Sequence, residues 1–350
     1  MTLPIAAPAL WCLLAAALFG ASTPVARALL DELGPLTLAG LFYLGASLGT
    51  APFARGAGET VARRRADRLR LLGAVLAGGV VGPVLVMLGL RQAPAASVAL
   101  WLNLEAPATA LLGWAFFREQ VDRRTWAAAA LVWAASVGLA APDGFSGGLG
   151  ALLVLGGCLA WGLDNNLTAV IDGFTPAQTT FVKGLVAGLV NLGLAAALGE
   201  AAPPLRAAAV ALVVGIFAYG ASIVLYVAGA QQLGATRAQM IFATAPFWGV
   251  GLAWLGLGEA AEPAQVGAAL GMVLALGLLF TERHSHLHEH EAERHTHWHR
   301  HDDGHHAHSH PGMPRWGWHI HEHDHEPLRH THPHRPDLHH RHRHEGGEGD

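Results

Sequence analysis

The residues of this chain most able to bind metal are its histidines, and all 23 of them lie after residue 283. Most recur at every second position, in the runs His284, His286, His288, His290, then His295, His297, His299, His301, then His330, His332, His334. In an extended chain, alternate side chains lie on one side about 6.6 Å apart. Two or three imidazoles could then meet one Zn²⁺, Ni²⁺, Co²⁺ or Cu²⁺ ion. We therefore predict a tail that binds divalent transition metals; the alternative is a low-complexity expansion that binds metal only as any histidine run does.

This tail has the composition of a segment that does not fold alone. Residues 294–302 recur as residues 329–337 with seven of nine positions identical, but no apolar periodicity accompanies the repeat. Such a segment cannot bury enough surface to offset its ordering entropy, so residues 284–350 are expected to be disordered without metal. Metal binding should weaken below about pH 6, where imidazole becomes protonated.

Three charged side chains stand out inside apolar runs of the preceding chain. Glu105 is near the middle of one run, while Asp164 and Lys183 lie at similar depth in two successive runs. A charge in hydrocarbon is costly, so each is a candidate for function. Asp164 and Lys183 could form a buried ion pair that neutralises both charges, or one of them could contact a bound solute or a proton.

Glu105 is the candidate for coupling or substrate sensing. A lone carboxylate away from water favours its neutral form and could exchange a proton during a transport cycle. The alternative is a carboxylate satisfied by Arg27, Tyr219 or a backbone group.

Three amides accompany these charges, namely Asn103 near Glu105, and Asn165 and Asn166 directly after Asp164. They could hold helices together by hydrogen bonds. They could also contact a cation or a polar metabolite, and we include all three among the candidate substrate or coupling residues.

Ten apolar runs must position these residues. Each is near the 20 residues that a hydrocarbon core of about 30 Å requires. They cover residues 6–28, 35–54, 70–91, 94–117, 125–141, 149–171, 176–198, 207–230, 236–257 and 263–281. Because 52% of the residues are hydrophobic and 14% charged, the chain is not an ordinary soluble domain. We predict an all-α membrane protein, and its net charge of -4 does not suggest nucleic acid as a partner.

Arginines are unevenly distributed among the connecting loops. Two alternate loops carry Arg55, Arg63, Arg64, Arg65, Arg68, Arg70, Arg118, Arg123 and Arg124, whereas the opposite loops carry the acids Asp31, Glu32, Asp143, Glu200 and Glu262. The positive-inside rule places the basic loops in the cytoplasm. An even number of spans then places both termini there. The expected localisation is a bacterial inner membrane, with multiple passes and a cytosolic tail.

The two halves of the apolar region resemble each other. Leu18-Phe19-Gly20 corresponds to Ala160-Trp161-Gly162, Glu105-Ala106-Pro107 to Thr244-Ala245-Pro246, and Glu119 to Glu259. The offsets are 142, 139 and 140 residues, so they agree within three positions. A five-span unit repeated in tandem inserts in opposite orientations, which is the plan of many secondary transporters with a site at the repeat interface. Glu119 and Glu259 lie at span ends, where exposure is cheap, and a structural role is expected for both.

These motifs resemble the drug/metabolite transporter superfamily, EamA type. The resemblance is carried by Phe19-Gly20 to Arg27, Leu90 to Leu104 with Pro107, Glu119, the run at Gly138, Tyr226 to Gly234, Ala235-Thr236-Arg237, Pro246, Glu259 and Gly267 to Gly277. It implies two inverted five-helix repeats, cytoplasmic termini and transport of small solutes, but no particular solute. We accordingly divide the chain into repeats at 1–142 and 143–281, with the tail at 282–350 outside the resemblance.

The leading interpretation is a secondary active transporter, an exporter of a small solute by alternating access, whose cytosolic tail binds metal. No phosphate-binding GxxxxGK[ST] loop is present, no cofactor is expected to be required, and an enzyme is not indicated. The alternatives are a transporter of metal ions themselves and a membrane-anchored metal-storage protein or metallochaperone. The body has no histidine and no paired cysteine, so it lacks an obvious path for a soft metal.

Small residues at spacing four, in the pairs Gly184/Gly188 and Gly267/Gly271, permit close helix approach. They predict either packing within the chain or the seam of a homodimer.

Overall fold

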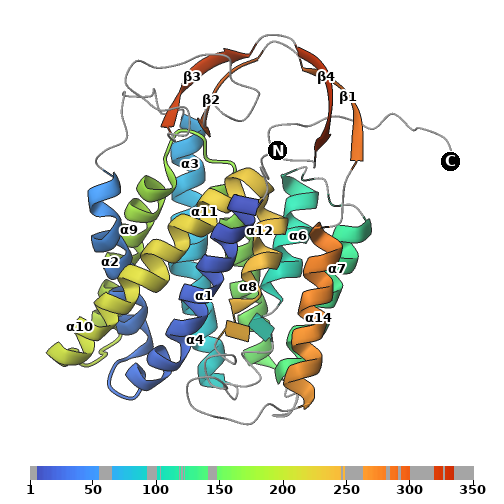
Figure 1. Cartoon of the computed structure of the whole chain (residues 1–350). Helices are drawn as coiled ribbons and strands as arrows, with labels where there is room; N and C mark the ends of the chain where they lie inside the picture. The colour runs from blue at the N-terminus through green and yellow to red at the C-terminus, as the bar shows by residue number, and fades with distance from the viewer. Residues whose placement is uncertain are drawn as a thin grey trace.

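The computed structural model describes most of the apolar region and four short segments of the tail (Figure 1). The described residues are 6–54, 65–92, 101–102, 104–117, 119, 121, 123–140, 148–245, 247–248, 263–280, 284–290, 293–299, 319–325 and 328–334.

The apolar region is helical, and each of the ten predicted segments contains helix. The first half contains α1 (Ala6–Leu29), α2 (Pro35–Ala54), α3 (Arg65–Ala74), η1 (Val75–Val81), α4 (Gly82–Gln92), α6 (Glu105–Phe116) and α7 (Arg123–Ala140). The second half contains α8 (Leu149–Ala169), α9 (Pro176–Ala197), α10 (Leu205–Val214), η3 (Gly215–Ala221), α11 (Ser222–Leu233), α12 (Ala235–Phe242) and α14 (Pro263–Phe280). The predicted all-α membrane fold is confirmed.

Local chemistry explains where these helices begin. Pro35, Pro176 and Pro263 occupy the first position of their helices, where a missing backbone N–H costs nothing. Before α9, the Thr175 hydroxyl accepts from the Gln178 backbone N–H, and the Gln178 side chain accepts from the Thr175 N–H. This reciprocal cap satisfies two donors that would otherwise face the membrane boundary unpaired.

The outer surface of the bundle is apolar, as a membrane requires. Four helical stretches in the described part of the chain are long and apolar enough to cross a bilayer, namely Pro35–Ala54, Arg65–Val86, Pro176–Ala197 and Leu205–Leu233. Large aliphatic side chains such as Leu152, Leu270 and Val273 are about two-thirds exposed, at 65–67%. A protein in water rarely exposes so many apolar groups.

Two short π-helical segments mark equivalent places in the two halves. η1 lies between α3 and α4, and η3 lies between α10 and α11, so each interrupts one long helix. Their first residues, Val75 and Gly215, are 140 positions apart, which is the offset of the sequence repeat. The repeat therefore reproduces a backbone irregularity as well as side-chain motifs.

Glycines allow helices of the two halves to cross at close distance. A Cβ on Gly20 of α1 would overlap the backbone of Ala245 in the second half. A Cβ on Gly162 of α8 would lie 3.0 Å from the backbone nitrogen of Thr109 in the first half. Because Gly20 and Gly162 are repeat partners, the first helix of each half packs against the fourth segment of the other.

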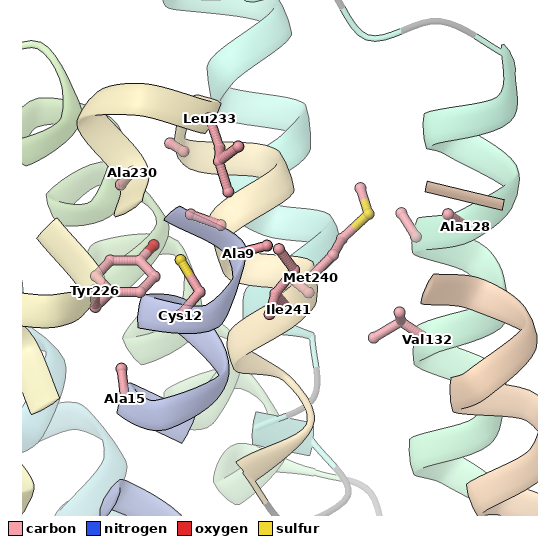
Figure 2. Packing of buried hydrophobic residues seen from close by; sticks show 14 of the residues in the cluster. Ala9, Cys12, Ala15, Ala128, Val132, Tyr226, Ala230, Leu233, Met240 and Ile241 are labelled. Atoms are coloured by element: carbon pink, nitrogen blue, oxygen red, sulfur yellow. The ribbon is translucent and has the colours of Figure 1, made fainter. Parts of the chain in front are cut away.

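The largest buried apolar cluster joins both halves. Figure 2 shows Cys12 and Ala15 of α1 beside Tyr226 and Ala230 of α11, with Met240 of α12 directed toward α7. The remaining members are mostly alanines and small aliphatic side chains. Small side chains allow helix axes to approach closely where lipid provides no hydrophobic driving force.

The glycine pair of α9 serves packing within the chain. A Cβ on Gly184 would meet the Tyr43 carbonyl and Ser47 of α2, and one on Gly188 would meet Leu44. On α14, Gly271 faces Ala135 of α7, while Gly267 meets nothing within 4 Å among the described residues.

The described parts of the tail are extended. β1 (His284–His290) pairs with β4 (Leu328–His334), and β2 (Glu293–His299) pairs with β3 (His319–His325), both antiparallel. They arch over the end of the bundle where α1 and α3 begin (Figure 1). Alternation at period two is also the pattern of a strand, and pairing satisfies the backbone polar groups of these segments. The expected disorder of residues 284–350 without metal stays a prediction.

Candidate functional site

Three consecutive polar residues of α8 form the centre of the candidate site. Asp164, Asn165 and Asn166 are 5%, 7% and 2% exposed. Neighbouring residues on a helix are rotated by about 100°, so the three side chains reach different partners.

Asn165 connects the two halves. Its amide nitrogen donates to Glu105 Oε1 at 3.0 Å and to Thr109 Oγ1 at 3.2 Å, both on α6. The same nitrogen lies 3.3 Å from Gln239 Oε1 on α12. Satisfaction of Glu105 by Arg27, Tyr219 or a backbone group was the alternative to a coupling role; the partner observed is an amide on α8, and the side chain of Arg27 is not described. Glu105 itself is only partly buried, unlike Asn165.

Helix breaks bring this network to the repeat interface. α6 begins at Glu105 after a turn closed by the Leu104 N–H on the Trp101 carbonyl, at 3.0 Å. α12 ends at Phe242, before a turn closed by the Thr244 N–H on the Ile241 carbonyl, at 3.1 Å. Glu105 and Thr244 are repeat partners, so both halves interrupt a helix at the same place. Discontinuous helices expose backbone groups and helix-end dipoles that can bind polar solutes.

Asp164 forms an ion pair with Lys183 of α9. Lys183 Nζ donates to Asp164 Oδ2, and each side chain is 7% exposed. The other oxygen, Asp164 Oδ1, is buried without a hydrogen-bond partner among the described residues. The predicted ion pair is thus present, and one of the two carboxylate oxygens of Asp164 accepts no hydrogen bond from the described residues.

The carbonyls of η1 are satisfied by side chains rather than by backbone alone. The Gly78 carbonyl accepts from Tyr43 Oη at 2.9 Å and Trp161 Nε1 at 3.1 Å, and the Gly79 carbonyl accepts from Asn191 Nδ2 at 2.9 Å. A Cβ on Gly78 would overlap Asp164. The π-helical segment is therefore held by α2, α8 and α9 and lies directly against the ion pair.

Aromatic rings from several helices also contact one another within the bundle. Tyr219 of η3 stacks on Phe42 with ring centroids 4.9 Å apart and also contacts Phe19 at 5.4 Å. Phe242 contacts Phe19 at 5.3 Å and Tyr226 at 5.1 Å. The rings come from both halves, so the repeat interface combines a polar network with aromatic surface.

Glu119 has a structural contact at the end of α6. The backbone N–H of Thr236 donates to both carboxylate oxygens, at 3.1 and 3.3 Å, and the Thr236 hydroxyl donates to Oε2 at 2.6 Å. The carboxylate therefore caps α12, whose positive end favours an anion. Contrary to the expectation of exposure, Glu119 is 8% exposed. Burial raises the pKa of the Glu119 carboxyl, and the Thr236 hydrogen bonds act in the opposite direction.

Glu200 caps the start of α2 in the same way, at the opposite end of the bundle. Glu200 Oε1 accepts from the Leu36 N–H at 3.1 Å, and Glu200 Oε2 accepts from the Thr37 N–H at 2.8 Å and the Thr37 hydroxyl at 2.7 Å. Glu200 belongs to the second half and α2 to the first, so both caps join the halves.

Several predicted residues lie outside this description. Asn103 and Glu259 are not among the described residues, and the side chain of Arg27 is not described. Asn166 donates to the Thr109 and Gly162 carbonyls at 3.0 and 2.8 Å, which places it in backbone packing.

Sequence reasoning overlooked Thr109, Gln239, Tyr43, Trp161 and Asn191. Thr109, Gln239 and Asn191 are polar residues inside apolar runs, a signal that could have found them.

The metal-binding prediction falls on the tail. Groups of three or more histidine, cysteine or acidic side chains able to hold a metal are absent from the side chains that the structure describes. The side chains of the tail histidines are not among these, so the predicted metal sites stay a prediction.

Known proteins share the sequence and fold of the helical region. Residues 6–141 and 148–281 each match the EamA-like transporter family. An "Uncharacterized transporter" of Methanothermobacter thermautotrophicus is 26% identical over 285 residues, covering 75% of this chain and 82% of the relative. A solved crystal structure aligns with a TM-score of 0.69 at 18% identity, covering 79% of this chain and 100% of that chain, which shows a shared fold. The two matched segments confirm the tandem repeat, and the tail lies outside both.

Proposed function

Because this multi-pass membrane protein belongs to the EamA-like transporter family, we propose that it is a secondary active exporter of a small solute across a bacterial inner membrane. Its cycle is alternating access, with both termini in the cytoplasm. The observation that carries this proposal is the hydrogen-bond network of Asn165 with Glu105, Thr109 and Gln239, which joins the two halves where their helices break.

Such a network suits a site that opens and closes. When the halves move apart, polar groups that lose one another need replacement partners, because an unpaired polar group away from water costs several kcal/mol, roughly 2–7. Water or the polar groups of a solute can supply those partners. Glu105 is the member with partial exposure, so it is the first group that an entering solute or proton would meet.

In this proposal Glu105 is the coupling acid, which takes up a proton when the solute leaves. Asp164 and Lys183 provide a neutralised charge pair beside η1, and the unused Asp164 Oδ1 accepts a donor from the solute. Asn103, two residues before Glu105, is included as a candidate contact of the same solute.

The Glu105→Gln variant tests the coupling role sharply. Glutamine keeps an oxygen that can accept from Asn165 but cannot exchange a proton. Proteoliposomes holding a pH-sensitive dye would be exposed to a mixture of amino acids, then to Zn²⁺ and Ni²⁺, under an imposed pH gradient. We expect wild-type protein to show solute-dependent proton flux with at least one probe and E105Q to lose at least tenfold of it.

The matched control is Glu32→Gln, which alters an exposed acid in the loop before α2. It should retain the wild-type flux. Undiminished proton flux in E105Q would refute the coupling role, and the absence of solute movement with every probe would count against these solute classes.

The tail is proposed to bind divalent transition metal in the cytosol and to act as a buffer or regulator of the transporter. A second candidate is transport of the metal itself, with the tail as collector. The carboxylates of Glu105 and Asp164 offer oxygen ligands, which suit hard ions better than soft ones, and this favours the first candidate. Storage or chaperoning by a merely anchored tail would give no role to the helix breaks that recur in the two halves.

A homodimer belongs to the same proposal. Gly267 on α14 meets no neighbour among the described residues, so a second copy could approach there, and mass determination in detergent would test it.

A further inference from the structure

The two strand pairs of the tail share one register. In β1 and β4, His284 is opposite His334, and in β2 and β3, His299 is opposite His319. In both sheets, the two residue numbers of every opposed pair add up to 618. The two two-stranded sheets therefore share the register that a single antiparallel hairpin would have.

This register places histidine opposite histidine at six positions. The pairs are His284/His334, His286/His332, His288/His330, His295/His323, His297/His321 and His299/His319. Every histidine of the duplicated runs that lies in a described strand thus has a histidine partner from a distant part of the tail.

The intervening positions support the same register without metal. Glu289 is opposite Arg329, and Arg294 is opposite Asp324, so residues of opposite charge are paired by the register in both sheets. Trp298 is opposite Ile320, an aromatic residue against a β-branched one. Cross-strand pairs of these kinds stabilise antiparallel strands by roughly 0.2–1 kcal/mol each.

Distance favours metal capture across the strands. Directly opposite residues have Cβ atoms about 4.5–5.5 Å apart, whereas residues two apart on one strand are about 6.6 Å apart. An ion with metal–nitrogen bonds of about 2.0–2.1 Å is therefore reached more easily by two opposed histidines than by His-x-His on one strand.

We propose that the tail's metal sites form across the hairpin, so that each bound divalent ion ties together histidines from opposite strands. This inference rests on the metal-binding part of the proposed function. It changes what the tail does: metal would fasten residues 284–290 to residues 328–334 and close a loop of about 50 residues, instead of decorating a loose chain. Closure of a long loop becomes favourable only when the ion supplies the missing binding energy.

Two variants, each lacking four histidines, distinguish metal sites formed across two strands from metal sites formed within one strand. The paired variant changes His286, His288, His330 and His332 to Asn and removes two opposed pairs. The unpaired variant changes His321, His323, His330 and His332 to Asn and breaks four opposed pairs; like the paired variant, it alters one strand with four alternating histidines and β4 with three. Each variant removes one His-x-His from two strands, so binding within single strands predicts equal losses.

The measurement is the number of Zn²⁺ ions bound per full-length protein in detergent, with a 1–283 truncation as background. We expect the unpaired variant to lose about twice as much bound Zn²⁺ as the paired variant. Equal losses would overturn the cross-strand proposal while leaving tail metal binding intact. Zn²⁺ binding by the full-length protein no greater than the truncation would instead overturn the tail's proposed function.

A second readout follows the hairpin itself. Spin labels at Thr296→Cys and Glu322→Cys, which are opposite in the register, should give one short distance that sharpens on adding Zn²⁺. Labels that stay broadly distributed with Zn²⁺ bound would contradict the hairpin.

Discussion

At the scale of single residues, α8 shows how one short sequence can serve three purposes. Asp164 pairs with Lys183, Asn165 reaches Glu105, and Asn166 binds backbone carbonyls. These contacts differ because successive side chains leave a helix in different directions. Three adjacent polar residues therefore do not form one ligand set, as their sequence proximity had suggested they could.

The buried ion pair gives a prediction at this scale. Lys183→Met leaves Asp164 as an uncompensated buried carboxylate, which should cost roughly 3–5 kcal/mol. The double variant Asp164→Asn with Lys183→Met removes both charges and should recover most of that loss. Thermal unfolding in detergent measures both, and a double variant no more stable than K183M would contradict charge compensation.

At the scale of elements, the two halves interlock through close helix crossings and caps. Gly162 of α8 lies against α6, and Glu119 after α6 caps α12. Glu200 caps α2 in the same way from the opposite end of the bundle. η1 and η3 interrupt equivalent helices and provide places where backbone hydrogen bonding can rearrange.

The crossing at Gly162 can be tested against a glycine in open space. Gly162→Ala should destabilise the protein, because its Cβ would lie 3.0 Å from the Thr109 backbone nitrogen. Gly193→Ala is the control: nothing lies within 4 Å of the added Cβ, and alanine is favoured over glycine in a helix by about 1 kcal/mol. We expect G162A to unfold at lower temperature and G193A at an equal or higher one. The reverse order would show that the crossing is not tight.

At the scale of the whole molecule, a helical body for transport carries a histidine tail over one of its ends (Figure 1). The described strands of the tail lie at the end where α1 and α3 begin. In our proposal, tail and body act on the same side of the membrane, and metal bound to the tail influences the body.

Whole-cell metal handling separates the roles of body and tail. A strain lacking the protein would be complemented with full-length protein or with residues 1–283, and its metal sensitivity and metal content would be measured. We expect a metal phenotype that only the full-length protein corrects, as a buffer or regulator requires. Correction by the truncation as well, with altered metal content, would make metal the transported solute and contradict our preference.

The sequence by itself determined the membrane class, the helical segments and the tandem repeat. Apolar runs of membrane length have few alternatives to helix in lipid, and the matching motifs recur at a nearly constant offset. It also identified Glu105, Asp164 and Lys183, because a charge inside an apolar run stands out.

Only the tertiary structure decided which of these groups meet. Asn165 could be assigned to Glu105 and Gln239, and Glu119 to Thr236, only once helices more than 50 residues apart in sequence were placed side by side. The same holds for the tail: alternating histidines indicate a capacity to bind metal, but the opposition of His284 to His334 depends on strand register. Hydrophobic length acts locally along the chain, whereas polar partnership depends on packing between distant segments.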